Sequence, residues 1–243
     1  MAKIGKFSKT GTLMQFENEA ERKKKARAAE ILGLLKKRYP TPASLLEFHN
    51  PWELMVATVL AAQCTDARVN QVTPKFFLRW PNPEALARAA QSEIEEVIHS
   101  TGLFRNKAKN LLAGAKWLKA NHNGILPKTI AELVKIPGIA RKTANIILWG
   151  GFGINEGLAV DTHVKRIAFR LGLTENTDPV KVERDLMPLF PQQEWGNGNH
   201  RLVWFGRDVC QARKPRCPEC ELRPVCPQCG LPQTAKRNVK SNG

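Results

Sequence analysis

The sequence lacks long apolar runs and a secretory leader. None of its 243 residues lies in an uninterrupted apolar stretch of 18, so we expect no membrane-spanning helix and no membrane partner. The first residues, MAKIGKFSKTG, lack the apolar centre of a signal peptide. These two absences predict an intracellular protein.

Acidic residues are scarce. Asp and Glu total 22 against 38 Lys and Arg, which gives a formal charge of +16 and a pI of about 9.9. A chain with this charge attracts polyanions, and nucleic acid is the first candidate partner. On charge alone, a basic protein that is merely soluble remains an alternative.

Strand signals are also missing, whereas helix signals recur along the chain. No stretch alternates apolar and polar residues between hairpin turns. Apolar spacing predicts a helix at Lys23–Arg38, and Asn50-Pro51 followed by Glu53 starts another. Ser92 and Glu95 have the spacing of a capping box. We therefore predict an all-α fold, with further helices at 105–118, at 179–190 with Asp178 as its N-cap, and at 195–210.

The stretch from Ile136 to Val164 predicts a helix-hairpin-helix. It reads IPGIARKTANIILWGGFGINEGLAVDTHV, in which Pro137-Gly138 breaks one short helix and a second begins at about Ile139. A tight glycine turn before a helix exposes backbone N–H groups that suit a phosphate oxygen. The segment GGFGINEG predicts a chain reversal, after which Asp161 is placed as an N-cap.

Five of the six cysteines lie between Cys210 and Cys229, which indicates a metal rather than disulfides in a reducing compartment. Four thiolates at this spacing can hold a [4Fe–4S] cluster or a tetrahedral zinc, and spacing alone does not decide between them. The pattern C-x6-C-x2-C-x5-C runs through Cys210, Cys217, Cys220 and Cys226. Zinc would more naturally use two CxxC pairs, the second ending at Cys229.

Three basic residues, Arg213, Lys214 and Arg216, lie between the first two cysteines of this pattern. A short loop pinned by metal could hold these side chains against a phosphate strand. We therefore count them as candidate DNA contacts.

The hairpin and the segment AVDTH, whose aspartate follows the hairpin lysine by 19 residues, resemble the active-site region of the endonuclease III family of DNA glycosylases. The resemblance implies that Lys142 is the nucleophile and Asp161 its electrostatic partner. It also places Gly138 and Ala140 of the hairpin against DNA. Ala140 stands where the family usually has a second glycine; a positive φ there would weaken the phosphate contact, whereas a helical conformation would remove the problem.

The resemblance extends to two further DNA contacts. A glutamine at the place of Gln63 enters the gap left by an extruded nucleotide, and the leucine matching Leu103 in TGLFRNKA wedges between bases. From the residues alone, Gln63 could equally satisfy a helix-end carbonyl, and Leu103 could be ordinary core.

The family's cysteine pattern matches the four cysteines Cys210, Cys217, Cys220 and Cys226, which favours a [4Fe–4S] cluster and makes Cys229 the spare. As in the family, we expect two lobes. One covers 44–154, the other 23–43 plus 155–226 with the cluster, and 1–22 and 230–243 form tails.

The expected function is that of a bifunctional DNA glycosylase and AP lyase in base excision repair. It would remove oxidised pyrimidines and nick the abasic site by β-elimination through a lysine Schiff base. Lys142 supports this, because family members specific for mispaired adenine lack a lysine there. The expected partner is double-stranded DNA that contains damaged bases or abasic sites. We expect the protein to be a monomer located in the cytoplasm or at the nucleoid.

Two alternatives stay open: a glycosylase for mispaired uracil or thymine, and a helix-hairpin-helix module that binds DNA without catalysis. A panel of lesion duplexes separates the first from the expected function, and incubation with abasic DNA separates the second.

Overall fold

The computed structural model describes residues 19–232, which contain helices and no strand, so the all-α prediction is confirmed. Short 3₁₀ turns lie at 99–101, 192–194, 217–219 and 223–225. The α-helices are α1 (Glu19–Arg38), α2 (Pro51–Leu60), α3 (Asp66–Arg79), α4 (Pro83–Ala87), α5 (Gln91–Ile98), α6 (Phe104–His122), α7 (Ile130–Leu133), α8 (Arg141–Phe152), α9 (Thr162–Arg170), α10 (Pro179–Leu186) and α11 (Trp195–Asp208).

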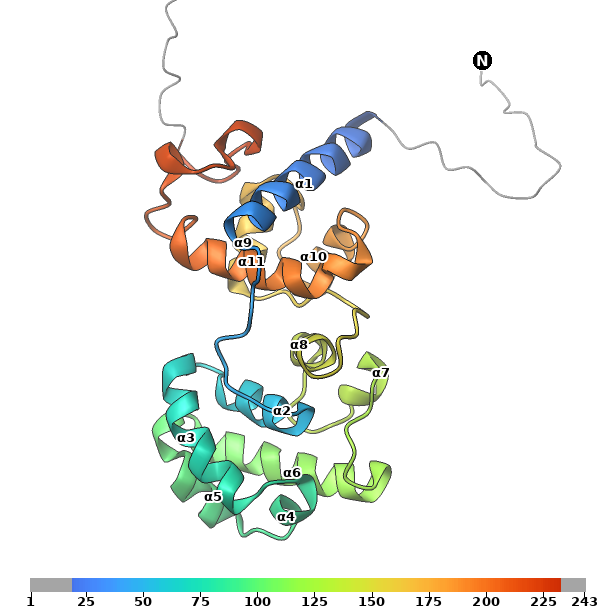
Figure 1. The fold of residues 1–243 in the computed structure, drawn as a ribbon, viewed down its shortest axis with the longest axis vertical. Helices are drawn as coiled ribbons and strands as arrows, with labels where there is room; N and C mark the ends of the chain where they lie inside the picture. Colours follow the sequence, from blue (N-terminus) through green and yellow to red (C-terminus); the bar gives the residue numbers. More distant parts are fainter. Residues whose placement is uncertain (1–18, 233–243) are drawn as a thin grey trace, which may run out of the picture.

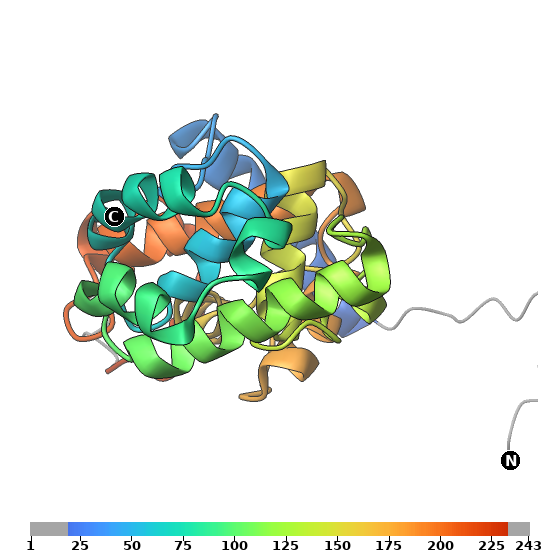
Figure 2. The same cartoon turned by 90° about the horizontal axis from the view of Figure 1, so that it is seen from below.

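The described residues form two hydrophobic cores. The first is built by α2 to α8 and contains Phe76, Leu111 and Ile147. The second joins α1 to α9, α10 and α11, with Ile31 and Phe205 among its buried residues. Figure 1 shows the two groups of helices one above the other, with α8 between them. From below, α6 lies across the end of the lower group (Figure 2).

Close packing of α8 on α2 explains part of the glycine-rich segment. Gly150 and Gly151, which we expected in a chain reversal, belong to α8. A Cβ on Gly150 would lie 2.7 Å from Leu54 Cδ2, and one on Gly151 would lie 3.0 Å from Pro51 Cβ. These glycines therefore let the two helices approach, and α8 ends at Gly153 with a left-handed φ of 70°.

Some of the predicted helix starts are confirmed, whereas other helices begin at different residues. Asn50 caps α2 and Asp178 caps α10, as predicted. In contrast, α5 begins after Ala90, whose N–H is bound at 2.9 Å by Glu93, rather than at Ser92 with Glu95. The second hairpin helix begins at Arg141 instead of Ile139.

The amino-terminal helix is longer than predicted. It begins at Glu19, so residues 19–22 are helical rather than part of a loose tail. Glu19 and Glu21 lie in its first turn, where carboxylates interact favourably with the helix dipole. The remaining tail residues 1–18, and 233–243 at the other end, lie outside the described residues.

Candidate active site and cysteine loop

A cleft of about 390 Å³ lies where the two cores meet, and Lys142 and Asp161 both line it. Its other walls come from the segment before α2, from the turn after α2 and from α11. Lys142, the second residue of α8, is solvent-exposed. The fold thus brings the two candidate catalytic side chains to one solvent-accessible space.

The hairpin conformation settles the question raised by Ala140. Ala140 is extended, with φ −89° and ψ 167°, so alanine is unstrained there although the residue is not helical. Gly138 is the residue that needs glycine: its φ is 86°, and a Cβ would lie 2.8 Å from Asn110 Cβ. One glycine therefore suffices for this turn.

Asp161 caps α9, as predicted. Its Oδ1 accepts a hydrogen bond from the Val164 N–H at 2.8 Å. Because the cap fixes the carboxyl group on a helix terminus, the half-buried side chain keeps a defined position at the cleft.

Glu183 of α10 holds the walls of the cleft together, a role that no sequence pattern indicated. Glu183 is 3% exposed, and its carboxylate accepts hydrogen bonds from Arg141 Nε at 2.5 Å and from Asn145 Nδ2 at 2.9 Å. It also accepts the Leu158 N–H at 3.2 Å. The first turns of α8 and the segment that leads to Asp161 are therefore anchored on one carboxylate.

The charges around Glu183 agree with this anchoring. The hydrogen bond to Glu183 raises the pKa of the Arg141 guanidinium above its usual value. A Cβ on Gly157 would lie 2.3 Å from Glu183 Oε1, so only glycine lets the chain pass this close. The Glu183 carboxylate thus balances the positive charge of Arg141 within the protein.

Residues of α11 complete the cleft. Arg207 forms an ion pair with Asp66 of α3 at 3.1 Å, which connects the two groups of helices at the edge of the cleft. His200 also lines it, and burial lowers the pKa of this histidine, which favours the neutral ring. No sequence pattern indicated a role for any of these three side chains.

The two predicted base-stack contacts are exposed residues in left-handed conformations. Gln63 has φ 52° and Leu103 has φ 48°. The Leu103 side chain is 53% exposed, so it is not ordinary core. Both residues follow the end of a helical segment, Gln63 after α2 and Leu103 after the 3₁₀ turn His99–Thr101.

The cysteine loop gathers four thiols around one apolar cavity. Cys210, Cys217, Cys220 and Cys226 all line it together with Leu171, Phe205 and Leu222, whereas Cys229 is not among the lining residues. Burial raises the pKa of the Cys226 thiol to about 11, and the other three thiols act in the same direction. Within residues 19–232, no three His, Cys, Asp or Glu side chains are arranged to hold a single metal ion.

Arg170 of α9 ties this loop to the second core. Its Nη1 donates to Cys210 Sγ at 3.4 Å and to the Gln211 carbonyl at 2.8 Å. Its own carbonyl accepts the Cys229 N–H at 3.1 Å. The helix that Asp161 caps thus contacts the cysteine loop at its other end.

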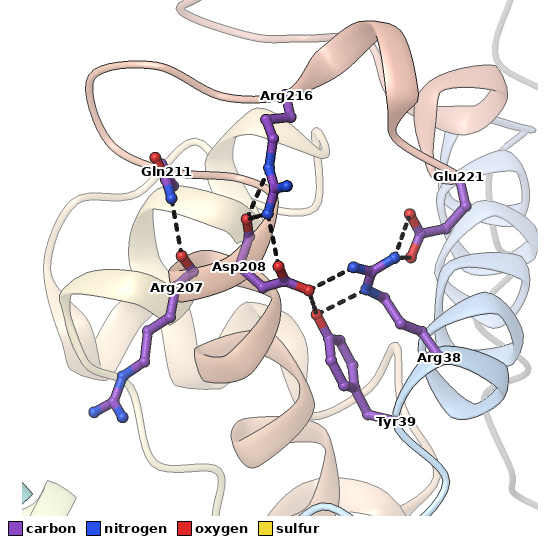
Figure 3. A network of polar contacts seen from close by, with 7 residues as sticks. All are labelled: Arg38, Tyr39, Arg207, Asp208, Gln211, Arg216 and Glu221. Carbon is purple, nitrogen blue, oxygen red and sulfur yellow. Dashed lines mark hydrogen bonds and ion pairs between the residues drawn. The ribbon is translucent and has the colours of Figure 1, made fainter.

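The three basic residues of the loop differ in their partners. Arg216 Nη2 is 2.7 Å from Asp208 Oδ1, and Asp208 is also bound by Arg38 and Tyr39 (Figure 3). Arg213 and Lys214 are exposed and form no ion pair with the described residues. Two of the three candidates are therefore free for an external anion.

Several known proteins resemble this chain in sequence and in fold. A model of the HhH-GPD superfamily of base excision DNA repair proteins matches residues 56–192. Endonuclease III of Synechocystis sp. is 53% identical over 204 residues, which are 84% of this chain and 93% of the relative. Endonuclease III of Bacillus subtilis is 43% identical, over 77% of this chain and 86% of the relative.

Solved structures of related proteins have the same fold. A trapped covalent intermediate of endonuclease III with DNA has a TM-score of 0.80 and 40% identity, covering 84% of this chain and 96% of that chain. A thermostable thymine-DNA glycosylase, with a TM-score of 0.76 over 87% of this chain and 98% of that chain, shares the fold at 21% identity.

The fold, the hairpin and these matches define a helix-hairpin-helix base excision repair protein. Within that superfamily, the chain belongs to the endonuclease III family. It is a DNA glycosylase with AP lyase activity that acts on DNA in base excision repair. Among its helices between residues 19 and 232, none has the length and apolar character needed to cross a bilayer.

The Glu183 anchor yields a testable prediction. Glu183→Gln removes the charge and one acceptor from a buried site, so it should lower unfolding free energy by roughly 1–3 kcal/mol and the Tm by several degrees. Turnover should fall as well, because Lys142 and Asp161 lose their common anchor. Calorimetry and a single-turnover assay measure both. Glu175→Gln, at an exposed position, is the matched control, and equal effects of the two variants would contradict the anchor.

Proposed function

We propose that Lys142 is the nucleophile and Asp161 its electrostatic partner in the removal of oxidised pyrimidines. The observation that carries this proposal is that both side chains line the same cleft although 19 residues separate them. The exposure of Lys142 at the start of α8 leaves its amine accessible to a sugar that enters the cleft.

The chemistry follows from these two groups. A damaged base is extruded from the duplex, and the Lys142 amine attacks the sugar carbon that carries it. The base leaves, the C1′–O4′ bond of the sugar ring opens, and the amine, having lost its protons, becomes a Schiff base. Loss of a C2′ proton then breaks the C3′–O bond, which releases the 3′ phosphate and nicks the strand. The Asp161 carboxylate stabilises the cationic sugar and accepts or returns the amine proton, while its cap bond keeps it in place.

The DNA contacts are proposed on three surfaces. The hairpin turn at Gly138 and Ala140 offers backbone N–H groups to a phosphate. Gln63 enters the gap left by the extruded nucleotide and Leu103 wedges between bases, and the exposure of both residues supports these roles. Arg213, Lys214 and Arg216 complete the proposed set, and neither Arg213 nor Lys214 forms an ion pair within residues 19–232.

We also propose that Cys210, Cys217, Cys220 and Cys226 hold a [4Fe–4S] cluster. The shared apolar cavity and the exclusion of Cys229 from it fit four thiolate ligands and a spare cysteine. The cluster would tie four points of a loop that has little apolar surface and so contribute to its folding. The Arg170 donor at Cys210 Sγ would stabilise the thiolate form of that ligand.

We also propose the division into lobes, the location and the oligomeric state of the protein. The two hydrophobic cores support lobes at 44–154 and at 23–43 plus 155–226. We also propose that the protein acts on DNA inside the cell, at the nucleoid or in the cytoplasm, and that it does so as a monomer. Removal of mispaired uracil or thymine is the second candidate activity, and the thymine-DNA glycosylase match supports only the shared fold.

The nucleophile is tested by trapping. Borohydride reduces an imine between protein and DNA, so the unaltered protein should become covalently linked to abasic DNA. Lys142→Gln should abolish both the trapped complex and strand cleavage, while binding to lesion DNA is kept. Gel analysis of trapping and filter binding measure these effects.

The control for this test is Lys119→Gln, an exposed lysine on α6 that should trap normally. Asp161→Asn keeps the capping oxygen but removes the charge, so trapping should persist at a rate lower by about 100-fold or more. Trapping by Lys142→Gln at the normal level would place the covalent bond on another amine.

The cofactor is tested by colour. A bound [4Fe–4S] cluster should make the purified protein yellow-brown, with absorbance near about 400 nm. Cys217→Ser should lose this absorbance and much stability, whereas Cys229→Ser should keep both. A colourless protein that contains one zinc would show the proposal to be wrong.

The contact of the cysteine loop with DNA is tested by salt. Each lost phosphate contact reduces the slope of log affinity against log salt by about 0.9. Arg213→Ala should therefore give a shallower slope on any DNA sequence. Arg216→Ala should change the slope less than Arg213→Ala does, because the Arg216 guanidinium is already bonded to Asp208. An unchanged slope for both variants removes the loop from the interface.

A further inference from the structure

Lys107 of α6 is a buried lysine that the catalytic site does not use. It is 4% exposed, and burial lowers the pKa of its ammonium, an effect that the nearby Cys64 thiol partly opposes. Burying an ammonium is costly, so such a group needs hydrogen bonds that compensate for lost water.

Those hydrogen bonds join two separate segments. Lys107 Nζ donates to the Leu60 carbonyl at 2.8 Å and to the Thr101 carbonyl, also at 2.8 Å. Leu60 is the last residue of α2, where helix carbonyls lack intrahelical donors. Thr101 ends the 3₁₀ turn that precedes α6 and is itself buried.

Each of the two carbonyls lies two or three residues before one of the two exposed left-handed residues. Gln63 follows Leu60 by three positions and has φ 52°, and Leu103 follows Thr101 by two positions and has φ 48°. A left-handed conformation costs a non-glycine residue about 1–2 kcal/mol, so each turn needs support from its surroundings. The ammonium supplies a common point of support for both.

We propose that Lys107 is a positioning residue that fixes the turn of Gln63 to the turn of Leu103, so that both side chains enter the base stack as one unit. This inference rests on the proposed DNA contacts of these two residues. Ordering two exposed turns separately would add an entropic cost to every binding event, and a shared anchor removes part of that cost before DNA arrives.

The test replaces Lys107 by methionine, which is one atom shorter but keeps an unbranched apolar stem and removes the donors. Two substrates carry the same oxidised pyrimidine, one in a fully paired duplex and one in a single-nucleotide bulge, where the base is already unstacked. On the paired duplex, single-turnover excision should fall about tenfold, equivalent to ~1.4 kcal/mol. On the bulge it should change little, because less unstacking is needed.

Lys116→Met is the matched control, since Lys116 is an exposed lysine farther along the same helix. Lys107→Gln is the second variant: its shorter amide cannot span both carbonyls, so it should show the same substrate selectivity if the methionine variant folds poorly. An equal loss on both substrates would indicate a purely structural lysine, and no loss on the paired duplex would likewise overturn the proposal.

Coupling of the two side chains gives an independent readout. With Lys107 present, the effects of Gln63→Ala and Leu103→Ala on paired-duplex excision should be non-additive, and in Lys107→Met they should become additive. Additive effects in both backgrounds contradict the shared anchor. If neither alanine variant affects paired-duplex excision, the proposed DNA contacts themselves are wrong, which is a different failure.

Discussion

The geometry of the cleft depends on the hydrogen bonds that the buried carboxylate of Glu183 accepts. It lies on α10, yet it binds donors on α8 and on the segment before α9. Lys142 stands next to one of those donors, and Asp161 follows another by three residues. A carboxylate with this many donors tolerates burial, and it converts three unrelated segments into one rigid frame.

The two turns that we propose to contact DNA differ from this frame, because they are strained and exposed. Gln63 and Leu103 adopt conformations that cost free energy, and Leu103 exposes apolar surface to water. These conformations persist in the folded protein because the packing of the flanking helices fixes both turns. The same helices leave both side chains pointing out of the core, where they are available to a partner that supplies an apolar or stacked environment.

Local signals predicted much of the fold from the sequence. Capping residues such as Asn50, Asp161 and Asp178 act within one turn, so their hydrogen bonds follow from spacing alone. Gly150 and Gly151 were assigned wrongly because glycine marks both turns and close helix packing, and only the position of α2 distinguishes the two. Ala90 was missed because alanine offers no capping oxygen.

The parts of the site that the sequence did not predict are those that depend on distant residues. Glu183 sits in an amphipathic helix where an acidic residue is ordinary, and its partners lie 25 to 42 positions away. The same holds for Arg216: a basic residue between cysteine ligands suggests a phosphate contact, but Asp208 is within reach only once α11 and the loop are folded. Through its pairing with Asp208, Arg216 fixes the loop. Arg213 and Lys214 in the same loop form no ion pair with the described part of the chain.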